Sequence, residues 1–236
     1  MYEYLTEELG RRFETVAVLK EQEGKRIVRV RHKETRTEYA LLSLQASGEL
    51  GECYRRLLPV SHPNLPQIYE VAEKEDRLLV LEEYIKGDSA ADMLRESAFT
   101  PAEVRRIALD VCQALIVLHG RGIVHRDVKP ENLVLRGDRT ILLDLDASRV
   151  RKEEQASDTM ILGTIGYAAP EQYGISQSDG RADIYALGVT MNQMLTGEHP
   201  SVRLAGGRFG RIISRCTMID PNLRFPDARS LMEVLA

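Results

Sequence analysis

The sequence predicts an α+β fold, in which a strand-rich N-terminal part precedes a mainly helical C-terminal part. Residues 12–85 contain segments rich in Val, Ile, Leu, Thr and Tyr that partly alternate with polar side chains, a pattern typical of strands. Several segments within residues 100–236 instead have apolar side chains at helical spacing. The short polar segment Tyr84–Ser89 separates the two patterns. We therefore expect two lobes, formed by residues 1–84 and 85–236.

The N-terminal lobe is expected to contain strands and one short helix. The helical spacing of Leu50, Cys53 and Leu57 predicts the helix, and the prolines of "SHPNLP" end it because proline cannot continue a helix. A hairpin follows that turns at Lys74–Asp76, where polar residues separate two apolar runs. The strands predicted before the helix are residues 12–20, 26–33 and 37–44, and the hairpin spans residues 67–85.

The C-terminal lobe is predicted to be built around a buried helix. Residues 182–195, "ADIYALGVTMNQML", are apolar nearly all round, which is typical of a helix that packs on every side. Earlier in the chain, Thr100 and Glu103 form a capping box with Pro101 at the first helical position. The predicted inner face of that helix is Val104, Ile107, Ala108, Val111, Cys112, Leu115 and Leu118. Residues 210–219 and 226–236 are expected to form further helices.

Composition and charge argue against several classes of protein. The chain has 236 residues and a net charge of −4, which gives no sign of a nucleic-acid partner. It has no apolar run that approaches the ~20 residues of a membrane-spanning helix, and its acidic N-terminus lacks the apolar core of a signal peptide. Cys53, Cys112 and Cys216 are scattered, as expected of small buried side chains in a reduced protein. We expect a cytoplasmic protein.

Three motifs in the second lobe carry the chemistry. Residues 125–132 are "HRDVKPEN", residues 144–146 are "DLD", and residues 169–171 are "APE". In this order and spacing they resemble the catalytic loop, the metal-binding segment and the closing segment of eukaryotic-type serine/threonine protein kinases, and the overall pattern resembles bacterial members. The likeness covers almost the whole chain. It implies a bilobal protein-kinase-like fold, with a small antiparallel β N-lobe that has one short helix and a mainly helical C-lobe.

The resemblance also implies a role for each polar side chain of these motifs. Phosphoryl transfer passes through a loose transition state, so positioning and charge neutralisation do most of the work. Asp127 would accept the proton of the substrate hydroxyl, and Lys129 would neutralise the moving phosphoryl group. Asn132 and Asp144 supply oxygen ligands, which suit Mg²⁺ or Mn²⁺. The alternative is an inert loop that has kept the same residues.

Five further positions match the family, four of them with structural roles. Asp183 would hold the catalytic loop from the buried helix, and Arg224 would pair with Glu171. The resemblance also implies a structural role for His125. Thr164 would line the groove that receives the phosphoacceptor.

The regulatory and nucleotide-binding positions are implied in the same way. Arg126 is typical of kinases that are activated by phosphorylation of a loop, and Thr159 is the matching phosphorylation site. The alternative for Thr159 is a solvated loop threonine. The residues expected to contact the adenine or to form the hinge beside it are Ile27, Ala40, Glu83, Ile85 and Val134. Ile27, Ala40 and Val134 fit plain core positions nearly as well.

The resemblance fails at the phosphate-binding motifs of the first lobe. In the family, the third strand supplies a lysine that binds the α- and β-phosphates, but the matching residue of "EYALLSL" is Leu42. The helix residue that pairs with that lysine falls near Cys53, beside Glu52. The glycine-rich loop falls on "KEQEGKRI", residues 20–27, which without those glycines cannot approach phosphate closely. The three glycine positions hold Lys20, Gln22 and Lys25.

Two functions are compatible with these observations. In the first, Lys25 replaces the missing lysine, an arrangement that resembles the with-no-lysine kinases, and the chain transfers the γ-phosphoryl group of ATP to a protein hydroxyl. The alternative for Lys25 is a solvated charged turn that points outward. In the second, the chain is a pseudokinase, a regulatory module that binds a protein partner with weak or no nucleotide turnover. The intact motifs favour the enzyme. A small-molecule kinase of the aminoglycoside type fits less well, because such enzymes lack the "KPEN" run and the "APE" segment.

Overall fold

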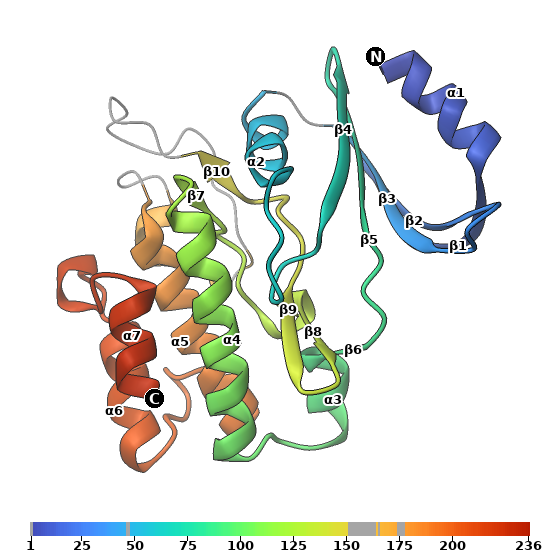
Figure 1. Ribbon diagram of the computed structural model, residues 1–236. Coiled ribbons are helices and arrows are strands. Elements are labelled where there is room, and N and C mark those ends of the chain that lie inside the picture. The colour runs from blue at the N-terminus through green and yellow to red at the C-terminus, as the bar shows by residue number, and fades with distance from the viewer. Residues whose placement is uncertain (1, 46–47, 151–163, 165, 174–177) are drawn as a thin grey trace. The chain divides into compact units, whose positions relative to one another are not determined.

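The computed structural model describes residues 2–45, 48–150, 164, 166–173 and 178–236, with side chains from residue 7 onward. The chain forms two compact units (Figure 1). Unit 1 comprises Met1–His62 and Pro66–Lys86, and unit 2 comprises Pro63–Leu65 and Gly87–Ala236. Within the described ranges, no helix is long and apolar enough to cross a membrane.

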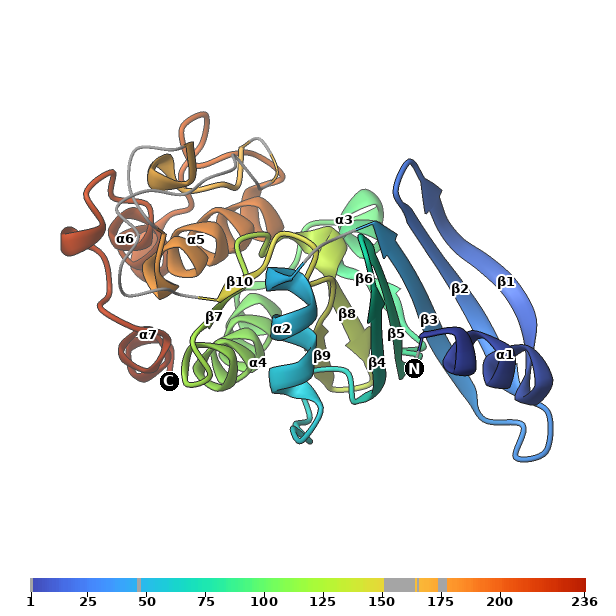
Figure 2. The same ribbon diagram turned by 90° about the horizontal axis from the view of Figure 1, so that it is seen from above.

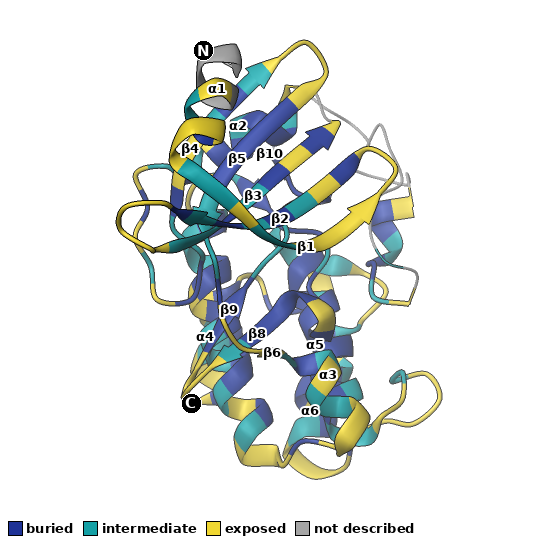
Figure 3. Ribbon diagram, turned by 90° about the vertical axis from the view of Figure 1, so that its right-hand side faces the viewer, coloured by how far each residue is buried: buried dark blue, intermediate teal, exposed yellow. Residues whose placement is uncertain are grey.

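Unit 1 is built on a five-stranded antiparallel sheet with the order β1-β2-β3-β5-β4. Strand β1 is the exposed edge, drawn largely yellow in Figure 3. The predicted strands and hairpin are all present, and the hairpin turns at residues 75–76 within the predicted segment. The strands are β1 Phe13–Gln22, β2 Lys25–His32, β3 Glu38–Gln45, β4 Ile68–Lys74 and β5 Arg77–Glu83.

One face of this sheet packs against a helix that the sequence pattern did not predict. Helix α1 spans Tyr2–Arg12 and buries Leu9 in a cluster with sheet residues. The ammonium of Lys33 donates hydrogen bonds to the carbonyls of Gly10 and Arg11, so it caps the C-terminus of α1. The sheet residues of the cluster are Val28, Val30, Ala72, Leu79 and Leu81. The predicted short helix, α2 (Glu49–Leu57), lies on the opposite side of the sheet (Figures 1 and 2).

The register between β2 and β3 decides which side chains lie together on the face of the sheet opposite to α1. Lys25 pairs with Leu44, and Ile27 pairs with Leu42. Directly paired residues of an antiparallel ladder point to the same face, and so do residues two apart on one strand. Lys25 and Leu42 are therefore diagonal neighbours on one face of the sheet, where the Leu42 side chain is buried.

Unit 2 is mainly helical and is organised around α5. Helix α5 (Gly180–Thr196) buries residues on all sides, as its apolar sequence predicts, and packs against α4, α6 and α7. The predicted capping box of α4 is present, with Thr100 and Glu103 exchanging hydrogen bonds. The other helices are α3 Ala90–Glu96, α4 Pro101–His119, α6 Gly207–Cys216 and α7 Ala228–Leu235. Short 3₁₀ helices span Pro130–Asn132, Pro170–Tyr173 and Pro221–Leu223.

Two small sheets in unit 2 carry the motif segments. Strand β7 (Ile123–Val124) ends directly before His125 and pairs with β10 (Arg149–Val150). The other sheet has the order β6-β8-β9, and its strand β8 begins directly after the catalytic loop. Its strands are β6 Asp88–Ser89, β8 Leu133–Arg136 and β9 Arg139–Leu142. These strands were not predicted, because runs of two to four residues are too short for an alternation pattern to identify them.

Candidate active site

The backbone of the loop formed by residues 125–132 is held by one buried carboxylate. Asp183 lies in the first turn of α5 and is 0% exposed. Its two oxygens accept hydrogen bonds from the amide of His125 at 2.9 Å and the amide of Arg126 at 2.6 Å. The imidazole Nε2 of His119 lies 2.8 Å from the same carboxylate. Burial opposes ionisation of Asp183, but these contacts, above all with His119, outweigh burial and lower its pKa.

The loop backbone is strained where Asp183 holds it. Arg126 has φ 69°, in the left-handed region that is uncommon for residues other than glycine. Such a conformation costs of order 1–3 kcal/mol and persists only where surrounding contacts fix it. Here Gln172 donates to the carbonyl of Arg126 at 3.0 Å, and Thr190 of α5 donates to the carbonyl of Val128 at 3.0 Å. These contacts fix the direction in which the next side chain, Asp127, leaves the loop.

Asp127, Lys129 and Thr164 form a hydrogen-bonded triangle. The Lys129 ammonium lies 2.7 Å from the Oδ2 atom of Asp127. The Thr164 hydroxyl donates to the Oδ1 atom of Asp127 at 2.6 Å, and Lys129 also donates to this hydroxyl. A threonine from the segment before "APE" is thereby joined to the two candidate catalytic residues.

The triangle sets the ionisation of Asp127. Burial opposes the charged form, but the hydrogen bonds from Lys129 and then Thr164 outweigh it, and the pKa of Asp127 is lowered. Asp127 is therefore a carboxylate at neutral pH. Because folding lowers this pKa, the ionised group stabilises the folded protein at pH values above the ordinary aspartate pKa. That contribution is lost as the pH falls through the lowered pKa.

The two candidate metal ligands are placed by the same loop. The Asn132 amide donates to the backbone carbonyl of Asp127 at 2.9 Å and to its Oδ2 atom at 3.0 Å. The amide of Leu143, which precedes Asp144, donates to the Asn132 carbonyl at 2.8 Å. His125 Nε2 donates to the Leu143 carbonyl at 3.1 Å, while its Nδ1 accepts from the Asp127 amide at 3.3 Å. The structure thus joins Asn132 directly to Asp127, and a backbone hydrogen bond links Asn132 to the residue before Asp144.

The donor set fits a magnesium ion better than a metal that needs several protein ligands. Asn132 and Asp144 offer one amide and one carboxylate, both with oxygen donors. Across the described part of the chain there is no cluster of three or more His, Cys, Asp or Glu side chains placed to hold a metal ion. Mg²⁺ usually binds through one or two carboxylates together with substrate phosphates and water.

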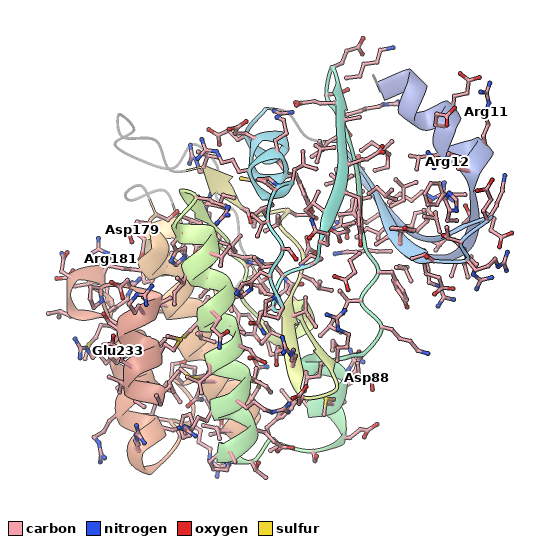
Figure 4. All side chains as sticks on the ribbon, viewed as in Figure 1. Arg11, Arg12, Asp88, Asp179, Arg181 and Glu233 are labelled. Atoms are coloured by element: carbon pink, nitrogen blue, oxygen red, sulfur yellow. The ribbon has the colours of Figure 1, made fainter. Side chains whose placement is uncertain are left out.

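The predicted pair between Arg224 and Glu171 is present and buried. Arg224 donates to both carboxylate oxygens of Glu171, at 2.6 and 2.9 Å, in a bidentate contact. The same guanidinium donates to the carbonyl of Arg181 at 3.0 Å. Arg181 in turn pairs with Asp179, and both are labelled in Figure 4. This network joins the "APE" segment to the start of α5.

The candidate nucleotide-binding residues of unit 1 lie on or beside β2, β3 and β5. Lys25 is only 6% exposed, so the alternative of a solvated, outward-pointing lysine is wrong. Ala40 and Ile85 are buried, and Ile27 is partly buried. The amide of Glu83 donates to the carbonyl of Gln67 at 2.8 Å. Val134, the last member of the predicted set, is buried on β8 in unit 2.

The remaining predicted positions are a helix residue and two regulatory residues. Cys53 of α2 is buried, and burial raises the pKa of its thiol to about 12. The adjacent Glu52 pairs with Arg56 at 2.9 Å and with Arg55. Arg126 is buried in the catalytic loop. Thr159 lies outside the described residues.

Sequence reasoning missed several residues that support the loop. His119, Gln172 and Thr190 contact Asp183 or the loop carbonyls from positions far away in the sequence. Gly180 lies so close to His119 that a Cβ atom there would meet the imidazole at 2.7 Å. The one available signal was that His119 is a basic residue in the last turn of α4. A basic residue there stabilises the C-terminal end of a helix, but it does not indicate a contact with Asp183.

The chain is similar in sequence to known proteins along most of its length. A family model described as the protein kinase domain matches residues 11–229. The serine/threonine-protein kinase PknJ of Mycobacterium tuberculosis is 32% identical over 184 residues, which cover 75% of this chain and 31% of that protein. Pkn2 of Myxococcus xanthus is 31% identical over 169 residues, covering 66% and 20% of the two chains. PknB of M. tuberculosis is 32% identical over 150 residues, covering 60% and 24%. The match therefore spans less than a third of the length of each of these relatives.

The first prediction concerns Asp183. Replacing it by alanine leaves two buried amides and His119 without their acceptor, so we expect Asp183→Ala to lower the free energy of unfolding by about 3–5 kcal/mol. Urea denaturation measures this change. Asp138→Ala, in the exposed turn between β8 and β9, is the matched control and should change stability by less than about 0.5 kcal/mol. Equal stability of the two variants would contradict the role given to Asp183.

The second prediction concerns the pH dependence of Asp127. Lys129→Met removes a hydrogen bond and a positive charge that favour the carboxylate, so the pKa of Asp127 should rise. Carboxyl-carbon NMR measures it without any need for activity. Thr164→Val should move it in the same direction. If the pKa of Asp127 stays at its wild-type value in both variants, the triangle does not control its ionisation.

Proposed function

We propose that this chain, which belongs to the protein kinase family, transfers the γ-phosphoryl group of ATP to a serine or threonine hydroxyl of a protein. The observation that carries the proposal is the triangle of Asp127, Lys129 and Thr164. It combines an ionised carboxylate, a cation beside it and a hydroxyl-bearing side chain at one place. Phosphoryl transfer needs a group that orients the attacking hydroxyl and a charge that balances the moving phosphoryl group.

In this proposal each residue of unit 2 has one task. Asp127 accepts the proton of the substrate hydroxyl, and Lys129 neutralises charge on the phosphoryl group in transit. Asn132 and Asp144 hold Mg²⁺ or Mn²⁺, which supplies charge neutralisation of the ATP phosphates when it is bound. Thr164 keeps Asp127 and Lys129 in place where the acceptor hydroxyl enters. Val134 is the adenine contact that we propose for unit 2.

The departures in unit 1 define the atypical part of the proposal. Leu42 replaces the phosphate-binding lysine and is buried, so this position offers no charge. Losing a buried charge contact without replacement typically costs ~2–5 kcal/mol, which is roughly 30- to several-thousand-fold in rate. We propose that Lys25 supplies the missing charge, because it is a buried lysine on the same face of the sheet as Leu42.

The second candidate function is a pseudokinase that acts as a regulatory binding module. The buried Leu42 and the glycine-poor segment 20–27 favour it, since both weaken phosphate binding. The intact set of polar residues in unit 2 favours the enzyme. Regulation through a phosphate on Thr159 that pairs with Arg126 stays a prediction, which mass spectrometry of active protein tests.

A pair of variants tests the proposed function. Asp144→Ala should abolish metal-dependent ATP binding, because it removes a metal ligand. Asp127→Ala should leave ATP binding nearly unchanged while it removes turnover, because a proton acceptor contributes mainly at the transition state. Calorimetry with ATP and Mg²⁺ measures binding, and labelled ATP with generic protein substrates measures transfer.

The control for this test is Asp138→Ala, which should match the wild type in both assays. Equal loss of ATP binding in the Asp127 and Asp144 variants would contradict the separate roles. A wild-type protein that binds ATP but never transfers phosphate, to itself or to generic substrates, would favour the pseudokinase.

A second test addresses Lys25. Lys25→Ala should weaken ATP binding or turnover at least tenfold, equivalent to about 1.4 kcal/mol. The double variant Lys25→Ala with Leu42→Lys should recover part of that loss, because the two positions are diagonal neighbours on one face. Lys20→Ala is the matched control, since Lys20 also stands at a glycine position but is exposed. Wild-type behaviour of Lys25→Ala would show that Lys25 does not replace the missing lysine.

A further inference from the structure

Unit 1 carries a pocket between α1 and the face of the sheet that α1 covers. Its volume is about 360 Å³, and pockets that bind small ligands typically have volumes of ~300–1,000 Å³. Leu9 of α1 and Leu81 of β5 line it, and both belong to the buried cluster that joins the helix to the sheet. The rest of the lining is unusual for a surface hollow, because it consists largely of ring side chains and carboxylates.

The strand register gathers the ring side chains at this pocket. Val30 belongs to the cluster under α1 and pairs with Tyr39 of β3. His32 follows Val30 by two residues on β2 and pairs with Phe13 of β1. Because directly paired residues share a face of a sheet, as do residues two apart on one strand, these rings all lie on the α1 side. With Tyr69 of β4, they line the pocket.

The rings stand nearly at right angles to one another. Phe13 and Tyr39 have ring centroids 5.5 Å apart and ring planes at 81°, and Tyr39 and Tyr69 have values of 5.2 Å and 81°. The face of an aromatic ring carries the negative part of its quadrupole. Two perpendicular rings form a corner, in which a single cation can contact both faces. Tyr69 is 47% exposed, and Phe13 and Tyr39 are only partly buried, so packing leaves ring surface open.

Carboxylates outnumber cationic side chains in the lining. Glu8, Glu34 and Glu70 line the pocket, and of its described lining residues Arg12, labelled in Figure 4, is the one arginine or lysine. Among the described side chains, neither Glu34 nor Glu70 has an ion-pair partner. Arg11 lies 3.6 Å from Glu8, so that carboxylate is partly neutralised. The remaining negative charge favours a cation in the pocket.

The cations that flank the pocket in the sequence have partners of their own. The ammonium of Lys33 donates to the carbonyls at the end of α1. The guanidinium of Arg36 lies 2.9 Å from the carboxylate of Glu14, and that of Arg11 lies 2.6 Å from Glu7. These contacts hold the three positive charges to groups that do not line the pocket.

The turn that carries Glu34 is fixed to α1 by backbone and side-chain hydrogen bonds. The amide of Lys33 donates to the carbonyl of Arg12 at 2.8 Å. The Nδ1 atom of His32 accepts a hydrogen bond from the amide of Thr35 at 3.2 Å, and this bond also fixes the imidazole. Because both sides of the pocket are joined before a ligand arrives, binding requires little additional ordering.

We propose that this pocket binds a methylated ammonium cation, carried either by a small quaternary amine or by a trimethyllysine side chain. Ring faces attract such a cation, and its methyl groups can contact the apolar residues Leu9 and Leu81. An unmodified lysine ammonium is strongly hydrated, so it loses more on entering an apolar pocket. None of the proposed active-site residues lines the pocket, so the cation site can be tested independently of kinase activity.

The test is an NMR titration of the chain with two matched pairs of ligands. The first pair is choline and its neutral analogue, in which carbon replaces the charged nitrogen. The second is a short capped peptide with a central trimethyllysine and the same peptide with unmodified lysine. In each pair the methylated cation should bind at least about tenfold tighter and shift the amide signals of residues that line the pocket. Whichever of choline and the trimethyllysine peptide binds more tightly identifies the source of the cation.

Variants of Tyr69 separate a cation–ring contact from simple apolar contact. Tyr69→Leu keeps an apolar side chain but has no ring face, so it should weaken cation binding about fivefold. Tyr69→Phe keeps the ring and should bind the cation like the wild type. The matched control is Tyr173→Leu in unit 2, because Tyr173 is 43% exposed against 47% for Tyr69 and does not line the pocket.

Charge variants test the role of the lining residues. Glu70→Gln should weaken binding of the methylated cations and leave binding of the neutral analogue unchanged. Glu75→Gln is its control, since Glu75 is exposed in the turn between β4 and β5 and does not line the pocket. Arg12→Ala removes a like charge and should strengthen cation binding. Urea denaturation of each variant shows that it is folded.

Three results would overturn the cation site. The first is that neither choline nor the trimethyllysine peptide binds, or that each binds no tighter than its matched partner. The second is wild-type affinity for the methylated cations in folded Tyr69→Leu. The third is a set of amide shifts confined to unit 2, which would place the bound cation away from this pocket.

Discussion

The buried carboxylate of Asp183 is the contact on which the candidate active site depends. It accepts two backbone amides of the catalytic loop and is joined to His119. These bonds fix Arg126 in a left-handed conformation that the chain would not adopt unaided. With Arg126 fixed, Asp127 points to Lys129 and Thr164, and Asn132 is bound to Asp127. The backbone that leads into Asp127 is thus held by a carboxylate buried in α5.

The two units bear on the proposed function in opposite directions. Unit 2 holds the polar residues that the proposed chemistry uses: Asp127, Lys129, Asn132 and Asp144. In unit 1, Leu42 is a buried apolar residue at the position where the resemblance implies a lysine, and Gly24 is the one glycine of residues 20–27. Weak phosphate binding slows the proposed reaction but does not prevent it, whereas loss of Asp127 removes the proton acceptor. For this reason we propose an atypical kinase in preference to an inert module.

Most of the fold could be predicted from the sequence, because its signals are local. Alternating strands gave the five-stranded sheet, and the capping box of Thr100 and Glu103 gave the start of α4. Helix α1 was missed because Leu9 alone of its described residues is buried in the sheet cluster. The motif spacing singled out the candidate catalytic residues. It could not show that Lys25 is buried or that His119 contacts Asp183, since both depend on packing between distant segments.

The central claim is that Asp127 takes part in phosphoryl transfer to a protein hydroxyl. The most direct measurement is phosphoamino-acid analysis of a single-turnover reaction with γ-labelled ATP and Mg²⁺, for the wild type and Asp127→Asn. The account predicts phosphoserine or phosphothreonine from the wild type and none from Asp127→Asn, with ATP bound equally by both. Equal amounts of labelled product from the two proteins, or none from the wild type while it binds ATP and metal, would contradict it.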